Sequence, residues 1–112
     1  MSKITTHILD TSRGRPAANV AVHLALRAGE VWKELATART DALGRIGTLL
    51  PADMPHAPGT FRLRFDVAEY FRTEGVPALF PYVDVIFEVH DDSHYHIPLL
   101  LSPFGYSTYR GG

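Results

Sequence analysis

Residues 20–27 read VAVHLALR, and large apolar side chains alternate in this stretch with small or polar ones. Successive side chains of a β-strand point to opposite faces of a sheet, so one face here is apolar and the other carries His23 and Arg27. This is the pattern of a strand that has one face in a core and the other in water. The stretch therefore predicts a half-buried strand.

The same alternation returns further along the chain, in FRLRFD at 61–66 and in YVDVIFEVH at 82–90. Weaker strand patterns cover residues 3–9, 32–40, 95–101 and 105–109. Short segments with turn residues separate them: Gly14 and Pro16, Gly29, and Asp41 and Gly44. Seven to eight short strands divided by tight turns predict an all-β sandwich of two antiparallel sheets.

One short helix is expected near residues 67–74. Asp66 is placed to cap its beginning, Glu69 completes a capping box, and Gly75 ends it. Pro98 lies inside a strand pattern but has no N–H to donate. We therefore expect that strand to be paired irregularly, or on one side only, at Pro98.

The composition limits the classes of function. A chain of 112 residues, 46% hydrophobic and 21% charged, is expected to form one domain over residues 1–112. With 11 basic and 12 acidic residues and no basic run, nucleic acid is not an expected partner. The absence of cysteine excludes disulfides, thiolate zinc sites and cysteine nucleophiles. No leader pattern or membrane-length apolar run is present, so we expect a cytoplasmic protein that does not bind a membrane.

The side chains that could carry chemistry are histidines and arginines. His94 and His96 are two residues apart and share a face of a strand, which is half of a metal site with His7 or His90 as a third ligand. The same residues also suit proton transfer, and Arg45 could stabilise a negative charge. Taken singly, each of these residues also fits a structural role, as a hydrogen-bonded histidine in a strand or a solvated arginine at the surface. His23 and His56 are expected to be exposed. No serine elbow or phosphate loop is present.

Two long segments carry a resemblance: TTHILDTSRGRPAANV at 5–20 and YHIPLLLSPFGYSTYRGG at 95–112. They resemble the most characteristic segments of the transthyretin-like family, in its 5-hydroxyisourate hydrolase branch, and the match runs from Thr5 to the last residue. The resemblance implies a transthyretin-like (prealbumin-like) sandwich with eight strands and one short helix. It also implies a homotetramer, a dimer of dimers, with active sites in a channel where the dimers meet.

The activity that the resemblance implies is hydrolysis of 5-hydroxyisourate, an unstable product of urate oxidation in purine catabolism. Water opens its six-membered ring at an amide bond and gives 2-oxo-4-hydroxy-4-carboxy-5-ureidoimidazoline, without a cofactor or a metal. The positions that match the family's catalytic residues are His7, Arg45 and His96, and those that match its substrate-binding terminus are Tyr109, Arg110, Gly111 and Gly112.

The chemistry assigns roles to these residue types, although it leaves open which histidine is the base. An imidazole takes a proton from the attacking water, and an arginine stabilises the oxyanion that forms. Arg110 could instead clamp the carbonyl groups of the substrate. The sequence departs from the family at Gly112, where a serine is usual, and at Leu43, where an acidic residue is common.

Two other functions remain open. A carrier with this architecture, as transthyretin is, would hold a hydrophobic small ligand in its channel without catalysis. A metal-dependent hydrolase would use His94, His96 and a third histidine around a zinc-bound water. The joint presence of His7, Arg45, His96 and the terminal Tyr-Arg-Gly favours the hydrolase without metal, because a carrier does not need this set.

Overall fold

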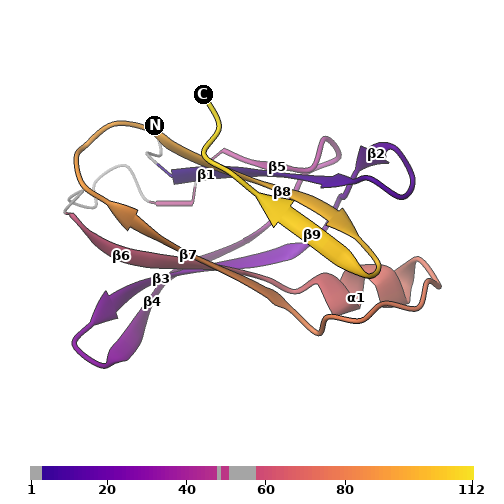
Figure 1. The fold of residues 1–112 in the computed structure, drawn as a ribbon, viewed down its shortest axis with the longest axis horizontal. Coiled ribbons are helices and arrows are strands. Elements are labelled where there is room, and N and C mark those ends of the chain that lie inside the picture. Colours follow the sequence, from indigo (N-terminus) through magenta and orange to yellow (C-terminus); the bar gives the residue numbers. More distant parts are fainter. Residues whose placement is uncertain (1–3, 48, 51–57) are drawn as a thin grey trace.

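The structure, a computed structural model, describes residues 4–47, 49–50 and 58–112. Within these ranges two β-sheets pack face to face, and one short helix lies at an end of the sandwich (Figure 1). The elements are β1 Ile4–Asp10, β2 Arg15–Pro16, β3 Ala21–Ala28, β4 Val31–Arg39, β5 Arg45–Ile46, β6 Gly59–Phe65, α1 Val67–Thr73, β7 Val83–Val89, β8 Tyr95–Ser102 and β9 Gly105–Thr108. The predicted sandwich with one helix is confirmed; His56 and the first residue of the pattern at 3–9 lie outside the described residues.

The relative direction of one pair of strands differs from the prediction. The first sheet runs β2-β1-β8-β9, with β5 also paired to β1, and the second runs β4-β3-β6-β7. β1 and β8 are parallel, whereas the other pairs between strands are antiparallel, so the expectation of two fully antiparallel sheets was wrong. The chain passes through the second sheet and α1 between β1 and β8, and a connection of that length permits parallel pairing.

Two strands of two residues each, β2 and β5, were expected to be turns. A pair of residues is too short to show alternation, so these strands could not be predicted from the pattern of apolar residues. β5 follows a turn at Gly44, whose φ is +76° and whose carbonyl accepts a 2.7 Å hydrogen bond from the Ile8 N–H. A Cβ at Gly44 would lie 2.4 Å from the Ile8 carbonyl oxygen, so only glycine fits. The turn therefore fixes Arg45 beside β1.

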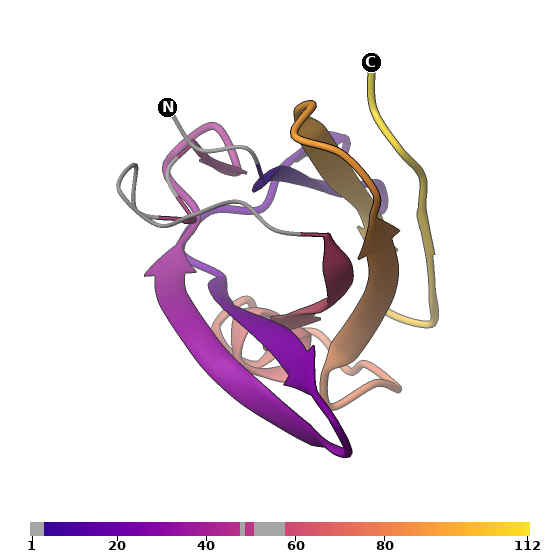
Figure 2. The ribbon, with the colours of Figure 1, turned by 90° about the vertical axis from the view of Figure 1, so that its left-hand side faces the viewer.

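The core lies between the two sheets, and the ribbon of Figure 2 shows how these sheets face each other. The alternation predicted its members: Phe61, Leu63 and Phe65 are buried, while Arg62 and Arg64 between them are only partly covered. Further core side chains come from alternate positions of β1, β3, β7 and β8, and others come from α1, β5 and the loops. No helix in the described ranges is long and apolar enough to cross a membrane.

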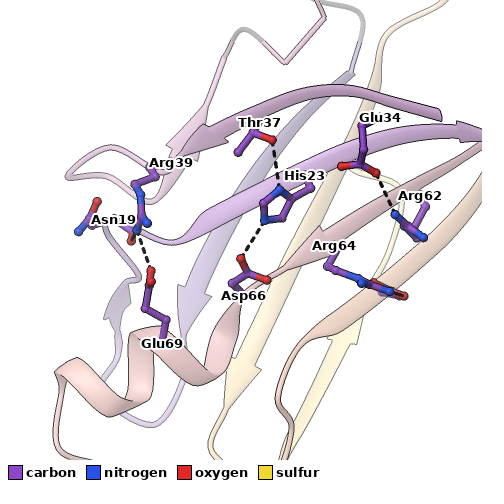
Figure 3. A network of polar contacts seen from close by, with 10 residues as sticks. Asn19, His23, Glu34, Thr37, Arg39, Arg62, Arg64, Asp66 and Glu69 are labelled. Carbon is purple, nitrogen blue, oxygen red and sulfur yellow. Dashed lines mark hydrogen bonds and ion pairs between the residues drawn. The ribbon is translucent and has the colours of Figure 1, made fainter. Parts of the chain in front are cut away.

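The beginning of α1 differs from the predicted capping box. Asp66 precedes the helix but makes no side-chain capping bond, and its Oδ2 lies 2.8 Å from His23 Nε2 instead (Figure 3). Glu69 accepts a 2.8 Å bond from Arg39. Each carboxylate thus has a partner from the adjacent sheet, which replaces the local bond. The end of the helix is as predicted, because Gly75 has a φ of +71° and its N–H donates to the Arg72 carbonyl.

The outer face of the second sheet carries paired charges. Arg64 binds Asp84 through two bonds of 2.7 and 2.8 Å. Arg62 donates to Glu34 at 3.1 Å, and its guanidinium also lies 4.9 Å from the centre of the Trp32 ring. Figure 3 shows Arg62 with Glu34, and Arg64 close to them, on this face. Because Arg62 and Arg64 are each paired with a carboxylate, neither offers a free cation to an anionic ligand.

Candidate active site

The polar side chains of interest gather on the outer face of the first sheet. β1 buries every second residue and leaves Thr5 and His7 partly exposed on the other face. His7 pairs with Arg45 of β5, and Thr5 pairs with His96 of β8. Residues opposite each other on paired strands point to the same face of a sheet. The structure therefore brings together the three predicted catalytic residues, which come from three strands.

A backbone carbonyl holds His7 in place. Its Nε2 lies 2.9 Å from the Leu43 carbonyl oxygen, which can only accept, so Nε2 carries a hydrogen and donates it. The Asp41 carboxylate organises the same turn by accepting from the N–H groups of Leu43 and Arg45. The bond from the Arg45 N–H is the main cause that lowers the pKa of Asp41. Because Leu43 acts through its backbone, the turn holds His7 without an acidic side chain at position 43.

Arg45 presents an unpaired cation beside His7. Its side chain is exposed and has no hydrogen bond or ion pair with the residues that the structure describes. In the second sheet, by contrast, Arg62 and Arg64 are each bound to a carboxylate. A guanidinium without a carboxylate partner keeps its donors available for an anionic group of a ligand.

Thr5 links two histidines, a contact that the sequence did not reveal. Its Oγ1 lies 2.8 Å from His96 Nδ1 and 2.7 Å from His94 Nε2. The two imidazole centres are 6.2 Å apart. The sequence held one signal of this contact. Thr5 lies two residues before His7, so the two side chains point to the same face of β1. Because Nδ1 of His96 makes the hydrogen bond with Thr5, Nε2 of His96 has no partner among the described residues.

His96 is kept neutral by its surroundings. Partial burial is the first cause that lowers its pKa, and electrostatic repulsion from His94, His7 and Arg45 acts in the same direction. A lowered pKa means that the ring is unprotonated at neutral pH. His96 is therefore suited to accept a proton there.

The end of the chain continues along β8 after β9 stops. Leu99 pairs with Thr108, and three residues further in the same register the Gly111 N–H donates a 2.7 Å bond to the His96 carbonyl. Between these two points the ladder is interrupted at Pro98, which pairs with His7 of β1 on its other side. The prediction of one-sided pairing at Pro98 is confirmed.

Gly111 makes room for the imidazole of His96. A Cβ at position 111 would lie 2.5 Å from His96 Cδ2, whereas one at Gly112 would meet nothing within 4 Å. Arg110 is turned elsewhere: it donates to Ser93 Oγ at 3.0 Å and lies 4.1 Å from the centre of the Tyr95 ring. The terminus thus reaches the site through Gly111, while the guanidinium of Arg110 lies on the segment before β8.

The site is an open surface in the single chain. A hollow of about 490 Å³ lies between α1 and the loop at Asn19, and none of the predicted site residues line it. Within the described ranges, no three His, Cys, Asp or Glu side chains lie in an arrangement that could hold a metal ion. One ring nitrogen of His94 and one of His96 face the hydroxyl of Thr5.

In sequence and fold, this chain is similar to known 5-hydroxyisourate hydrolases and transthyretins. The model of the HIUase/Transthyretin family matches residues 4–111. A 5-hydroxyisourate hydrolase of Caulobacter vibrioides is 47% identical, over 99% of this chain and 99% of that protein. The structure of Klebsiella pneumoniae 5-hydroxyisourate hydrolase is 36% identical, with a TM-score of 0.85 over 97% of this chain and 98% of that one. Sea bream transthyretin in complex with thyroxine is 32% identical, with a TM-score of 0.91 over 98% and 95% of the two chains.

Proposed function

Since the chain belongs to the HIUase/transthyretin family, we propose that it is a 5-hydroxyisourate hydrolase that works through the outer face of its first sheet. The observation that carries this assignment is the meeting of His7, Arg45 and His96 on one face, with Gly111 packed against the His96 ring. The relatives named as hydrolases, including the enzyme of Caulobacter vibrioides, support the substrate and the reaction.

In the proposed mechanism, His96 is the base. Its Nε2 takes a proton from water as the water oxygen attacks the ring carbonyl, because this nitrogen has no partner among the described residues and the lowered pKa keeps the ring neutral. His7 is less suited to this task through Nε2, which already donates to the Leu43 carbonyl. Its Nδ1 remains available to orient the substrate.

Arg45 stabilises the oxyanion. The attacked carbonyl gains negative charge in the transition state, and a fixed cation lowers the energy of that state more than that of the ground state. The exposed guanidinium beside His7 has no carboxylate partner in the described chain, so this stabilisation is not weakened by a competing ion pair.

A carrier function is the second candidate, because sea bream transthyretin has the same fold and was solved with thyroxine. The polar character of the face argues against it for this chain. Three histidines and Arg45, which has no carboxylate partner in the described part of the chain, lie on this face. A hydrophobic ligand would have to displace their water, which is costly unless the ligand pairs with them.

The experiment that tests the function uses freshly made 5-hydroxyisourate. The compound is generated enzymatically from urate, and its loss is followed by ultraviolet absorbance with and without the protein. A hydrolase increases the decay rate in proportion to protein concentration. A carrier would bind the compound stoichiometrically and leave the decay rate outside the complex unchanged, which would exclude the proposed activity.

We expect the protein to be a tetramer at micromolar concentration. β7 and β9 are edge strands, and no described strand pairs with their outer backbone groups. Each also exposes an apolar or aromatic side chain: Ile86 on β7 is 58% exposed, and Tyr106 on β9 is 44% exposed. Such edges can pair with a second copy of the chain. A second copy could also cover the open site and exclude water from it. Light scattering should give four times the chain mass of 12.4 kDa. A fully active monomer would disprove both the assembly and a site that needs a second copy.

Gly111→Ala is expected to lower turnover by about 10²-fold, because the new methyl group must displace the His96 ring, and small misplacements of a catalytic group have effects of that size. Gly112→Ala is the matched control, since its Cβ meets no atom of the chain. Rates and the imidazole NMR signals of both variants would be measured. Equal rates for the two variants, with an unchanged His96 signal, would show that Gly111 is not needed to seat the ring.

A further inference from the structure

Base catalysis by His96 raises a problem of charge. When Nε2 takes a proton from water, the ring becomes an imidazolium, and its surroundings disfavour that form. The ring is partly buried, and Arg45, together with any charge on His94 or His7, disfavours a positive charge on it. His96 would accept a proton more readily if the resulting positive charge could be transferred to a more exposed group.

The geometry supplies a route for the charge. Thr5 Oγ1 lies within 2.8 Å of His96 Nδ1 and within 2.7 Å of His94 Nε2. A hydroxyl has one hydrogen and two lone pairs, so it cannot donate to both rings and must accept from one of them. If the His96 Nδ1–H donates to Thr5, then Thr5 donates to His94. This orientation leaves Nε2 of His96 unprotonated and ready to act as a base.

His94 is suited to be the far end of such a route. It lies just before β8 and is exposed, whereas His96 is partly buried. Its Nδ1 has no partner among the residues that the structure describes, so this nitrogen meets solvent. Water stabilises a charged ring at this place better than the partly buried site does.

We propose that His96, Thr5 and His94 form a proton relay that moves the positive charge of the base step from the site to the exposed ring of His94. This inference rests on the hydrolysis proposed above and concerns how its protons move. Nothing in the relay touches the substrate except His96, so Thr5 and His94 assist catalysis only through His96.

The protons balance in both halves of the reaction. As the bond between the water oxygen and the carbonyl carbon forms, a water proton goes to His96 Nε2. The Nδ1 proton of His96 then passes to Thr5 Oγ1 while the hydroxyl proton of Thr5 passes to His94 Nε2, which leaves His94 charged and His96 neutral. When the carbon–nitrogen bond breaks, these transfers run backwards and His96 Nε2 protonates the leaving nitrogen. The relay returns to its first state.

Two substitutions at Thr5 separate the hydroxyl from the space that it fills. Thr5→Val keeps the shape and removes the hydroxyl, and Thr5→Ser keeps the hydroxyl. We expect kcat to fall by about 10- to 100-fold in Thr5→Val, a fraction of the full effect of a general base, and by less than about threefold in Thr5→Ser. A Thr5→Val enzyme with the wild-type kcat would overturn the relay.

The sharper test uses chemical rescue at His94. Because His94 is exposed, His94→Ala leaves a space that solvent and small molecules can reach. We expect its kcat to be reduced and to rise again with added imidazole, while the Thr5→Val/His94→Ala double variant shows no rise. The assays are run near pH 8, above the ordinary histidine pKa of about 6.5, so that His96 is neutral in every variant. Decay caused by imidazole alone is subtracted.

The outcomes distinguish the relay from the function itself. If the wild-type protein does not accelerate the decay of 5-hydroxyisourate, the proposed function fails. Two outcomes refute the relay while the function stands, provided that the wild type is active. In the first, His94→Ala is as active as the wild type. In the second, imidazole raises the rate of the double variant as much as that of the single variant. Reduced activity in His94→Ala that imidazole restores only when Thr5 is present supports it.

Discussion

His7→Ala, Arg45→Ala and His96→Ala should each lower kcat/KM for 5-hydroxyisourate by at least ~10²-fold while the protein stays folded. Removal of a general base costs about 10²- to 10⁴-fold, and removal of an oxyanion donor about 10²- to 10³-fold. None of the three side chains belongs to the buried core, so their removal leaves no cavity there. The loss should therefore appear in the rate and not in the thermal unfolding.

Matched controls exist on the surface of the same chain. His90 and Arg72 are exposed residues outside the site, and alanine at either position removes an imidazole or a guanidinium without touching the first sheet's outer face. Both control variants should keep wild-type rates. A near-normal rate in any of the three site variants, with a native circular dichroism spectrum, would show that the role given to that residue is wrong.

Deletion of Tyr109–Gly112 should abolish most of the activity and leave the subunit folded. The deletion removes the bond from the Gly111 N–H to the His96 carbonyl, and the backbone on which the His96 ring packs. β9 ends at Thr108, before the deleted residues, so both sheets keep their strands. Apart from the support of His96, the deletion removes, among the described residues, only surface contacts of Arg110 with Ser93, the His94 carbonyl and the Tyr95 ring, so activity should fall much further than stability.

The truncated protein would be compared with Gly112→Ser, which restores the serine usual in the family. A Cβ at 112 meets no atom within 4 Å, so the serine fits, and one new hydrogen bond of about 0.5–1.5 kcal/mol limits any gain to roughly tenfold. Rates, circular dichroism and light scattering are measured on both variants. If the truncated chain, folded and assembled, hydrolysed the substrate near the full-length rate, the terminus would have no part in the site.

Much of the fold could be predicted because alternation reports burial directly. The pattern at 61–66 gave the correct inward residues, and the breaker residues gave the turns at Gly29 and Gly75. The parallel pairing of β1 with β8 could not be predicted, because alternation fixes the faces of a strand but not its neighbour. Asp66 was misassigned for a related reason: its partner, His23, comes from a different strand.

The site shows the same limit. The resemblance to a family supplied His7, Arg45 and His96, and their meeting on one face is a property of the sheet register. Thr5 escaped notice because a threonine in a strand is ordinary, and its contact with His96 joins residues 91 positions apart. The direction of Arg110 toward Tyr95 also depends on packing that the sequence does not show. The extent of the domain, the cytoplasmic location and the roles of the terminal residues stay predictions.

The pH dependence of kcat/KM tests the central claim, that neutral His96 is the base, most directly. A base acts when unprotonated, so kcat/KM should be level above the pKa of the free enzyme's base and fall tenfold per pH unit below it. Because burial and the nearby positive charges lower the pKa of His96, the midpoint should lie below the ordinary value of about 6.5. The fall should persist in His7→Asn and move toward higher pH, since His7 is one of those charges. A midpoint above the ordinary histidine value, or a fall that vanishes when His7 alone is replaced, would contradict the assignment of the base to His96.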